Sequence, residues 1–450
     1  MAVTQRARTY GDLVVDDPRE FRVHGSIYTD PQVFQEEMDR IFEGTWVYVG
    51  HESELPAPGD YKTVLVGRQP LIVARHEDGR IYALYNRCRH RGAVVCREER
   101  GHSNFFRCRY HNWVYANNGA LIGMAQASGY PEDLDRSRYG LIPSARLASY
   151  RGLLFVNLSP TGPSLEEHLE PVRKYVDYWF GRSPSERIQV ILPPHRYEYP
   201  GNWKLQAENG FDGYHGNYVH LSWQRVLQLS KESTVEEVQQ YRQEGCVRGL
   251  RNGHGLLERP GSLNPASSWT ARMMHRYPEY AEAMRKRFDD AQLMEISARR
   301  NIFVFPNLYL FDTHIRVIVP KAVDRTEVQL YVYALEDVPE ASRTRTAALP
   351  WSAPTSSRTC GPWNCLWTTD ARRGPDAWSP TWTATCSTCG WANTRAAATR
   401  RPTPTSPRRY SSVCRGRGTP TRGPGLWEPG RGRAVTRTGW CARTTSRWDW

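Results

Sequence analysis

The stretches Cys88-Arg89-His90 and Cys108-Arg109-Tyr110-His111 decide the fold of this chain. Seventeen residues separate them, so two short loops bring metal-binding side chains close together in the sequence. Each stretch pairs one cysteine with one histidine: Cys88 with His90, and Cys108 with His111. Two thiolates and two imidazoles are the ligands of a [2Fe–2S] cluster whose second iron is held by histidines, a centre that accepts electrons and passes them on.

A structural zinc site is the competing interpretation, because two cysteines and two histidines also form a common zinc set. Zinc sites usually pair like with like at short spacing, whereas each pair here is mixed and lies on its own loop. Ligand type and spacing therefore favour the iron–sulfur cluster. Cys96 lies between the pairs, and we interpret it as a buried free thiol.

Strand patterns surround the two pairs. Apolar runs predict four strands: 61–66, 71–74, 81–85 and 153–156. Glu77-Asp78-Gly79 predicts a hairpin turn between the second and third of them. Residues 45–160 are therefore expected to form a compact β-domain that carries the metal loops.

Helical periodicity dominates on either side of this domain. Helices are predicted over four ranges: 28–46, 165–180, 202–220 and 278–297. Asp30 and Pro31 give the first of them an N-cap and a first-turn proline. Late strands are predicted over 301–310, 314–319 and 327–335. Strands and helices in blocks, without strict alternation, indicate an α+β fold.

Asp212, His215 and His220 form a second candidate metal site. Two histidines and one carboxylate are the facial ligand set of non-haem Fe(II) oxygenases, which leaves open positions for O2. On a helix, this spacing keeps both imidazoles near one side if the helix loosens at Gly216-Asn217. The alternatives are that both histidines are structural or exposed, and that Asp212 only caps a helix turn.

Both constellations resemble known families. The first resembles a Rieske domain, through residues 88–92, Cys96, residues 108–111 and Trp113; Asn112 stands where that family often has glycine. The second resembles the large (alpha) subunits of aromatic-ring-hydroxylating dioxygenases. Its matching residues are Asn202-Trp203-Lys204, Glu208-Asn209, Asp212, Tyr214-His215, His220 and Phe305-Pro306-Asn307. The resemblance covers roughly residues 25–340.

The resemblance implies a role for each candidate residue. The cluster ligands would be Cys88, His90, Cys108 and His111. His215 and His220 would bind one mononuclear Fe(II), and Asp212 would be the catalytic bridging acid, which joins the His111 of a neighbouring subunit to His215. The implied fold is an all-β Rieske domain followed by an antiparallel-sheet-and-helix catalytic domain of the helix-grip type.

The resemblance also implies an activity and partners. The chain would be the catalytic large subunit of a dioxygenase that adds O2, its co-substrate, to an aromatic ring to give a cis-dihydrodiol. No Gly-rich dinucleotide fingerprint is present, so a separate reductase, with or without a ferredoxin, would oxidise NADH. A small beta subunit would join it in an α3β3 assembly. A Rieske monooxygenase or demethylase acting on an aromatic substrate is the alternative function, and a pure electron carrier is a third.

The substrate is marked at residues 251–255. Arg251-Asn252-Gly253-His254-Gly255 resembles the pocket-side region of family members that act on aromatic carboxylates such as benzoate. Arg248 or Arg251 could pair with a carboxylate through two hydrogen bonds. The alternative is that both are surface arginines.

The last hundred residues differ from the rest of the chain. Residues 351–450 contain 16 Arg, no Lys and four acidic residues, and they hold 10 of the 16 Trp but only two Leu and two Val. So few aliphatic residues cannot build a core, and neither helical nor alternating periodicity is present. We interpret this tail as an out-of-frame reading of a GC-rich gene. An Arg/Trp-rich tail that binds nucleic acid is the alternative.

The tail also bears on the third iron ligand and on the net charge. In the family that ligand is an aspartate about 150 residues after the second histidine. Asp370 fits this spacing from His220, but its neighbours do not resemble the family context.

The tail carries +12 of the net charge of +13, so the rest of the chain is almost neutral. That balance argues against nucleic acid as a partner of the folded part.

We expect four parts along the chain: an N-terminal helical segment over 1–44 that packs on the catalytic domain, the Rieske domain over 45–160, a C-terminally incomplete catalytic domain over 161–345, and the tail over 346–450. No N-terminal apolar segment or membrane-length apolar run is present. A cytoplasmic protein without membrane contacts is therefore expected, with its cysteines serving as metal ligands rather than disulfide partners.

Overall fold

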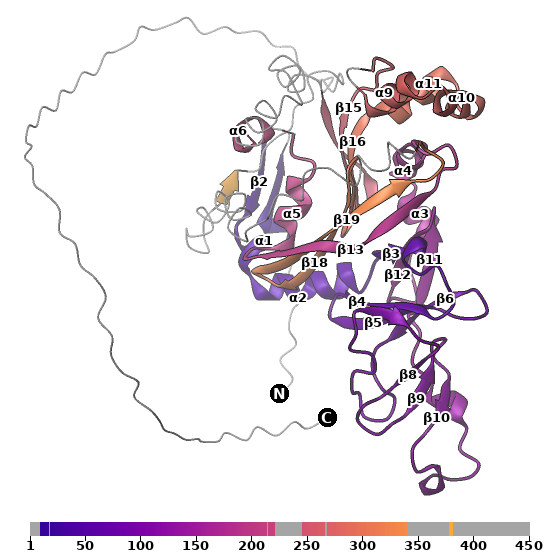
Figure 1. The fold of residues 1–450 in the computed structure, drawn as a ribbon. Coiled ribbons are helices and arrows are strands. Elements are labelled where there is room, and N and C mark those ends of the chain that lie inside the picture. Colours follow the sequence, from indigo (N-terminus) through magenta and orange to yellow (C-terminus); the bar gives the residue numbers. More distant parts are fainter. Residues whose placement is uncertain are drawn as a thin grey trace, which may run out of the picture. The chain divides into compact units, whose positions relative to one another are not determined.

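The computed structural model describes residues 10–17, 19–213, 215–220, 245–265, 268–339 and 378–380. Within these residues the strands form five sheets in which every pairing is antiparallel, and helices lie between and beside the sheets (Figure 1). The α+β fold class is confirmed.

The residues around the metal loops fold into small sheets. The first has the order β6-β5-β4-β7 and consists of Asp60–Val66 (β4), Gln69–Arg75 (β5), Ile81–Tyr85 (β6) and Arg100–His102 (β7). The second has the order β10-β9-β8 and consists of Phe105–Arg107 (β8), Val114–Ala116 (β9) and Leu121–Gly123 (β10). The third consists of Val47–His51 (β3), Arg146–Tyr150 (β11) and Leu153–Asn157 (β12). The predicted hairpin at residues 77–79 is confirmed by the pairing of β5 with β6.

A seven-stranded sheet carries the second candidate site. Its order is β13-β19-β18-β17-β16-β15-β14. The strands are Ile188–Tyr199 (β13), Cys246–Gly249 (β14), Gly255–Arg259 (β15), Arg299–Val304 (β16), Leu308–Leu310 (β17), Ile315–Ala322 (β18) and Arg325–Leu335 (β19). The single strand predicted over 301–310 is wrong, because Phe305-Pro306-Asn307 turns the chain and Pro306 has no N–H for the ladder.

The helices are shorter than their periodicity predicted. They are Ser26–Thr29 (α1), Pro31–Glu37 (α2), Leu165–Leu169 (α3), Arg173–Phe180 (α4), Trp203–Asn209 (α5), Gly216–Val219 (α6), Trp269–Arg276 (α9), Pro278–Arg287 (α10) and Asp290–Ser297 (α11). Asp30 caps α2 as predicted, with its side chain accepting from the Gln32 N–H at 2.8 Å. A π-helical turn continues α2 to Phe42, short of the predicted end. Pro171 divides the helix predicted over 165–180, because a proline nitrogen cannot donate inside a helix.

Five short 3₁₀ helices complete the described elements: Gly11–Leu13, Glu52–Glu54, Ala127–Gly129, Arg136–Tyr139 and Arg251–Gly253. Strands Val14–Asp17 (β1) and Glu20–His24 (β2) pair with each other, and β2 also pairs with Trp378–Pro380 (β20), the described part of the tail. Asp370 lies outside the described residues. No described helix is long and apolar enough to cross a membrane.

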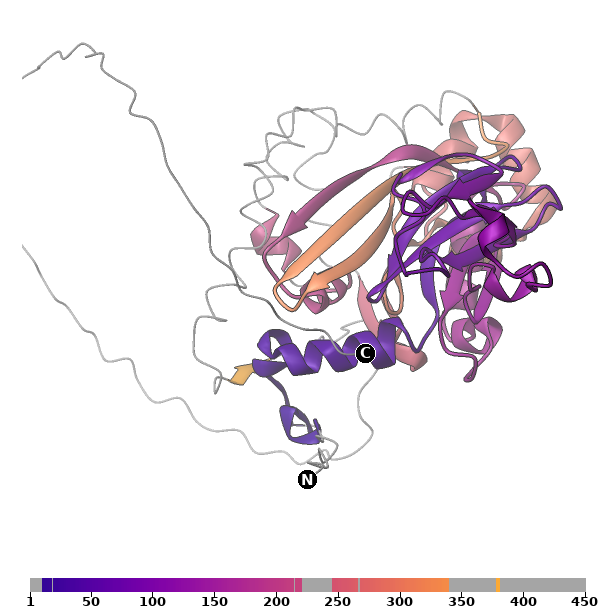
Figure 2. The same ribbon diagram turned by 90° about the horizontal axis from the view of Figure 1, so that it is seen from below.

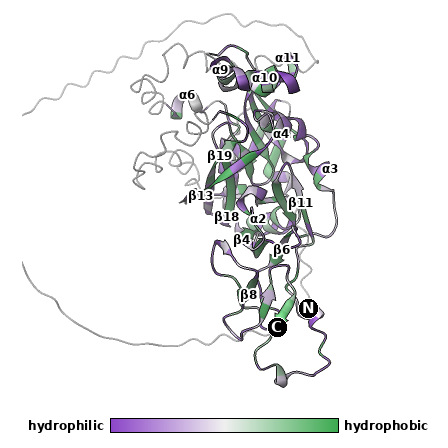
Figure 3. Cartoon of the chain, turned by 45° about the vertical axis from the view of Figure 1, so that its right-hand side comes forward, coloured by the Kyte–Doolittle hydropathy of each residue, from purple (hydrophilic) through white to green (hydrophobic). Residues whose placement is uncertain are grey.

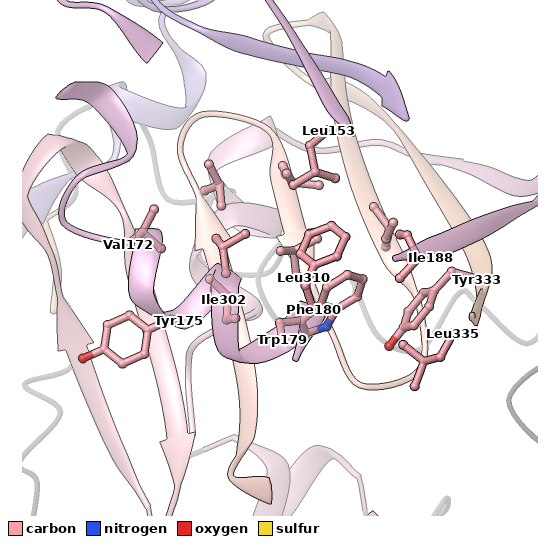
Figure 4. Packing of buried hydrophobic residues seen from close by; sticks show 14 of the residues in the cluster. Leu153, Val172, Tyr175, Trp179, Phe180, Ile188, Ile302, Leu310, Tyr333 and Leu335 are labelled. Atoms are coloured by element: carbon pink, nitrogen blue, oxygen red, sulfur yellow. The ribbon is translucent and has the colours of Figure 1, made fainter. Parts of the chain in front are cut away.

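Hydrophobic cores lie on both faces of the seven-stranded sheet, because neighbouring strand residues point to opposite faces. Ile302 joins the core that contains Trp179 and Phe180 of α4. Figure 4 shows the Trp179 and Phe180 side chains beside Leu310. Phe303, the next residue, joins the other core. Figure 3 shows hydrophobic residues along the sheet strands, whereas α9–α11 mix both kinds. Each large apolar side chain buried in this way stabilises the fold by about 2 kcal/mol.

The N-terminal helix packs on the helix that precedes the second site. Phe34, Met38 and Phe42 share a core with Trp203 and Ala207 of α5. The Phe42 and Trp203 rings meet edge to face, with centroids 4.9 Å apart. Figures 1 and 2 both draw α2 alongside the strands of the seven-stranded sheet. The second site is therefore supported by residues far away in the sequence.

Candidate functional site

The two cluster loops have the same backbone form. In the first, the Cys88 N–H donates to the Ala93 carbonyl at 2.8 Å, and the Gly92 N–H donates to the Cys88 carbonyl at 2.9 Å. In the second, the Cys108 N–H donates to the Trp113 carbonyl at 2.8 Å, and the Asn112 N–H donates to the Cys108 carbonyl at 3.0 Å. Each cysteine is thus held at the start of a closed five-residue turn.

Asn112 takes the glycine position of the second loop without breaking its form. Its φ is +56°, and that of Gly92, its equivalent in the first loop, is +71°. Asparagine is among the few side chains that tolerate this left-handed region. The departure from the family pattern therefore has a local explanation.

The structure brings the four predicted cluster ligands together. The Cys88 and Cys108 thiols are buried and interact with each other. The His90 and His111 rings lie 4.6 Å apart at their centroids, and His90 is exposed. The His90 ring also stacks on Trp113, with centroids 5.0 Å apart and an interplanar angle of 11°. Sulfur ligands inside and imidazoles toward the surface suit a cluster that must exchange electrons with a partner.

Tyr115, which follows the second cysteine and histidine pair in the sequence, contacts the first pair in the structure. Its hydroxyl oxygen lies 3.2 Å from Sγ of Cys88 and accepts the Arg89 N–H at 3.0 Å. Because the Tyr115 oxygen accepts the Arg89 N–H, the hydroxyl hydrogen of Tyr115 can point at the Cys88 sulfur. Burial raises the pKa of the Cys88 thiol, and this hydrogen bond lowers it. A thiolate at Cys88 is therefore supported by its neighbour, as a metal ligand requires.

Cys96 belongs to the loop scaffold. Its backbone N–H donates to Oδ1 of Asn86 at 2.9 Å, and its carbonyl accepts from the same amide at 2.6 Å. Its buried thiol contacts the Glu98 carbonyl at 3.6 Å. The interpretation of Cys96 as a buried thiol is confirmed.

The single helix predicted over 202–220 is wrong. Helix α5 ends at Asn209, a loop carries Gly210 and Asp212, and His215 begins the short helix α6. Gly210, the C-cap of α5, sits directly over the Tyr309 ring, where any side chain would collide. The two histidines therefore meet across a loop and a helical turn, not along one helix face.

Asp212, His215 and His220 nevertheless lie together, as predicted. The two histidine Nε2 atoms are 3.2 Å apart, and their rings are tilted by 69°. Oδ2 of Asp212 lies 2.9 Å from Nδ1 of His215, off the line of the N–H bond, and Oδ1 accepts the His215 backbone N–H at 3.3 Å. Asp212 thus both shapes the turn and supports the ring. It contacts the ring nitrogen that faces away from His220.

Electrostatics keep His220 able to bind a metal. Burial, with the nearby His215, lowers the pKa of His220 to about 4. A neutral imidazole offers a free lone pair at neutral pH, which is what a metal ligand requires. Two Nε2 atoms facing each other at 3.2 Å form an open pair of nitrogen donors.

The donor sets fit the two iron centres unequally. A [2Fe–2S] cluster needs two protein ligands on each iron, and the first site supplies two thiols and two imidazoles. The second site supplies two imidazoles for a single ion. Among the described residues no group of three or more His, Cys, Asp and Glu is placed to hold one metal ion.

The pocket-side interpretation of residues 251–255 is not supported. Arg251 is exposed and pairs with Glu170, and Arg248 lies 3.4 Å from Glu258. His254 is buried. Its Nδ1 accepts the Phe305 N–H at 3.0 Å, and its Nε2 donates to the His168 carbonyl at 2.8 Å. Both arginines are surface residues, and His254 ties two loops together.

A buried polar network joins the N-terminal segment to α5. The Tyr28 hydroxyl donates to Oε1 of Glu208 at 2.8 Å. Glu37 accepts from Nζ of Lys204 at 2.6 Å and from Nε1 of Trp203 at 2.8 Å. Glu208 keeps part of its side chain at the surface, but burial of the carboxyl raises its pKa to about 7. Only the folded chain reveals this network, because its two halves lie 166 to 180 positions apart in the sequence.

Two family models match the chain. The Rieske [2Fe-2S] domain matches residues 45–142, and the ring hydroxylating alpha subunit (catalytic domain) matches residues 191–354. The chain is 36% identical over 337 residues to the toluate 1,2-dioxygenase subunit alpha of Pseudomonas putida, which covers 72% of each chain. It is 35% identical over 353 residues to the 2-halobenzoate 1,2-dioxygenase large subunit of Burkholderia cepacia, which covers 74% of this chain and 73% of the other.

Solved structures share the fold. A naphthalene 1,2-dioxygenase variant bound to phenanthrene superposes with a TM-score of 0.69 at 26% identity, covering 80% of this chain and 83% of that one. These similarities cover both metal sites. They show an oxidoreductase that uses O2 and has a Rieske [2Fe–2S] cluster and a mononuclear non-haem iron as its cofactors.

Proposed function

We propose that this chain, which belongs to the large (alpha) subunits of Rieske ring-hydroxylating dioxygenases, adds both atoms of O2 to the ring of an aromatic carboxylate. The observation that carries the proposal is the presence of both donor sets in one chain: the cysteine and histidine pairs of the two loops, and the facing Nε2 atoms of His215 and His220. The relatives named for toluate and 2-halobenzoate support the substrate class.

The chain's own residues hold and connect the two centres. A [2Fe–2S] cluster held by the two loops would supply single electrons, and an iron held by His215 and His220 would supply the chemistry that activates O2. His90 presents its ring at the surface, where a partner can reach it. Asp212 holds His215 from the opposite ring nitrogen and keeps about a quarter of its side chain exposed, at 23%. That exposure supports Asp212 as the acid that meets the His111 of a neighbouring subunit.

The partners follow from this arrangement. A partly exposed bridging acid would need a histidine from a neighbouring subunit, which supports an oligomer, with a beta subunit in an α3β3 assembly. Electrons would come from NADH through a separate reductase and, where present, a ferredoxin. The four cysteines of the described residues form no disulfide, which suits a reducing compartment such as the cytoplasm.

Iron content and labelled oxygen test the proposal together. The protein isolated from its source, reduced chemically and exposed to ¹⁸O2 with benzoate, is expected to give a dihydrodiol with both oxygens labelled. One labelled oxygen would instead indicate the monooxygenase or demethylase alternative. About three iron ions per chain support the oxygenase, and about two support an electron carrier.

Two variants assign the irons to their sites. Cys108→Ser should remove the visible spectrum of the cluster. His215→Ala should keep that spectrum and lose one iron and all product. Loss of both signals in His215→Ala would show that the two centres are not independent, and would count against the proposal.

A further inference from the structure

The indole of Trp113 supports the exposed cluster histidine, His90, from one side. The indole and the His90 ring lie flat against each other, with centroids 5.0 Å apart and an interplanar angle of 11°. Trp113 is buried, with 3% of its surface exposed, whereas His90 lies at the surface. One face of the His90 ring therefore rests on a buried flat surface.

The two cluster histidines are supported differently. The His111 ring packs against Tyr110, its neighbour in the chain, with centroids 3.8 Å apart, and Tyr110 is 57% exposed. The contact between His90 and Trp113 instead joins the first cluster loop to the second. The plane of the His90 ring is thus set from across the cluster, by a buried residue of the other loop.

The indole is in turn oriented by a lobe, defined as residues 124–139, between β10 and β11. Nε1 of Trp113 donates to the Tyr130 hydroxyl at 3.3 Å, and the two rings meet at an interplanar angle of 70°. The Tyr139 ring meets the same indole at 85°, with centroids 6.0 Å apart. Since the indole has a single N–H donor, the hydrogen bond to Tyr130 fixes its rotation.

The lobe directs its aromatic side chains at the cluster loops. Most of its residues are exposed. Tyr130 and Tyr139 are half-buried, and they pack against the core that contains Trp113 and the two cluster cysteines. The lobe therefore reaches His90 through one shared ring, the indole.

The plane of an imidazole ring sets the directions of both its nitrogens. One nitrogen of a cluster histidine binds iron, and the other faces the surroundings. Contacts behind a metal-bound histidine fix the orientation of its ring and are part of how the site functions. Whatever holds the plane of His90 therefore also holds the direction in which its outer nitrogen meets a partner.

We propose that Tyr130 is a positioning residue for electron transfer: through the Trp113 indole it fixes the plane of the His90 ring on the cluster. The inference rests on the cluster of the proposed function, and not on the choice of substrate. The alternative is that Trp113 and Tyr130 only fill the core, since a buried indole N–H usually finds a hydrogen-bond partner in any case.

Pulsed EPR of the reduced, cluster-loaded protein tests this, because the nitrogen couplings of a histidine ligand depend on the orientation of its ring. Tyr130→Phe is expected to shift the couplings of one histidine and leave those of the other unchanged. Electron transfer out of the cluster should slow about tenfold. Tyr139→Phe is the matched control and should change neither, because it keeps the ring that meets the same indole.

A double-mutant cycle separates positioning from packing. Trp113→Phe keeps an aromatic ring but has no N–H, so adding Tyr130→Phe to it should cause no further shift of the couplings. A further shift as large as that of Tyr130→Phe alone would overturn the inference, because Tyr130 would then not act through the indole. Visible absorbance checks that each variant keeps its cluster.

The outcomes also separate this inference from the proposed function. If the wild-type protein shows a [2Fe–2S] signal without histidine nitrogen couplings, the Rieske cluster is refuted, and the proposed function with it. If the wild type shows these couplings and Tyr130→Phe leaves them unchanged, only the positioning role of Tyr130 is overturned.

Discussion

Gly92 and Asn112 occupy equivalent positions in the two cluster loops. Each lies four residues after a cluster cysteine, donates its N–H to that cysteine's carbonyl, and has a left-handed backbone. The two loops therefore repeat one turn around the cluster. The histidine, in contrast, comes two residues after the cysteine in the first loop and three after it in the second.

Asn112→Gly should leave stability and cluster content almost unchanged, because both residues accept the left-handed region. Asn112→Val should destabilise the Rieske region by about 1–2 kcal/mol, because a β-branched side chain is strained there. Denaturant unfolding followed by cluster absorbance measures both. Gly92→Ala is the control for backbone strain alone, since no atom lies within 4 Å of an added Cβ. Equal midpoints for the valine and glycine variants would contradict this account.

Tyr115→Phe should lower the reduction potential of the cluster. The variant removes the hydroxyl 3.2 Å from Sγ of Cys88, and a hydrogen bond to a ligand sulfur favours the electron-rich reduced form. Redox titration followed by EPR gives the potential. Tyr61→Phe is the matched control, because the Tyr61 hydroxyl interacts with Cys96, which is not a ligand. The same potential in both variants would refute the role of Tyr115.

Asp212→Asn should slow electron transfer to the mononuclear site by about 10–100-fold, the usual effect of losing a support behind a metal-bound histidine. The cluster spectrum and its potential should not change. Rapid mixing of the reduced protein with O2 gives the rate of cluster oxidation. Asp324→Asn, an exposed acid in the turn after β18, serves as the control. A wild-type rate in Asp212→Asn would exclude a bridging role.

Glu208 should make folding stability depend on pH. Burial raises its folded pKa to about 7 from an ordinary 4.5, so the folded chain holds a proton that the unfolded chain releases. The stabilisation is complete below pH 4.5 and is lost as the pH rises to about 7, an effect of about 3 kcal/mol.

Glu208→Gln should remove this loss of stability, because glutamine cannot ionise. Urea unfolding at intervals between pH 5 and 8 measures the slope, with exposed Glu279→Gln as the control. A wild-type slope in Glu208→Gln would show that the pH dependence arises elsewhere.

The tail over 346–450 is proposed to be the product of a shifted reading frame. Mass spectrometry of the protein isolated from its source is then expected to find peptides of the body and none from residues 351–450. DNA sequencing across codons 335–355 should show one inserted or deleted base. Recovery of tail peptides that contain Trp378 would refute the proposal.

Local sequence predicted what local physics controls. The hairpin at Glu77-Asp78-Gly79, the Asp30 cap and the ligand pairs at 88–90 and 108–111 all depend on neighbours within a few residues. The helix expected over 202–220 is wrong: α5 ends at Asn209, and the next residue, Gly210, packs closely against Tyr309. That contact joins residues about a hundred positions apart, so no window of sequence contains it.

The side chains expected to bind a substrate carboxylate make other contacts, for a similar reason. Arg251 and His254 carry the right chemistry, but only packing decides which way a side chain points. Arg251 forms an ion pair with Glu170 at the surface, and both ring nitrogens of His254 form hydrogen bonds with backbone atoms. A sequence motif shows which side chains are present, but it does not show in which direction each side chain points in the folded protein.

The sequence by itself determined the donors: two mixed cysteine and histidine pairs, two further histidines and an acid, whose identities are covalent facts. Only the tertiary structure decided how they are used. It placed Asp212 on Nδ1 of His215 and Asn209 near Nε2, and it set the Tyr115 hydroxyl against Cys88. The physical reason is that a metal site depends on the direction of each lone pair, and those directions are set by the packing of α5 and the cluster loops against distant strands.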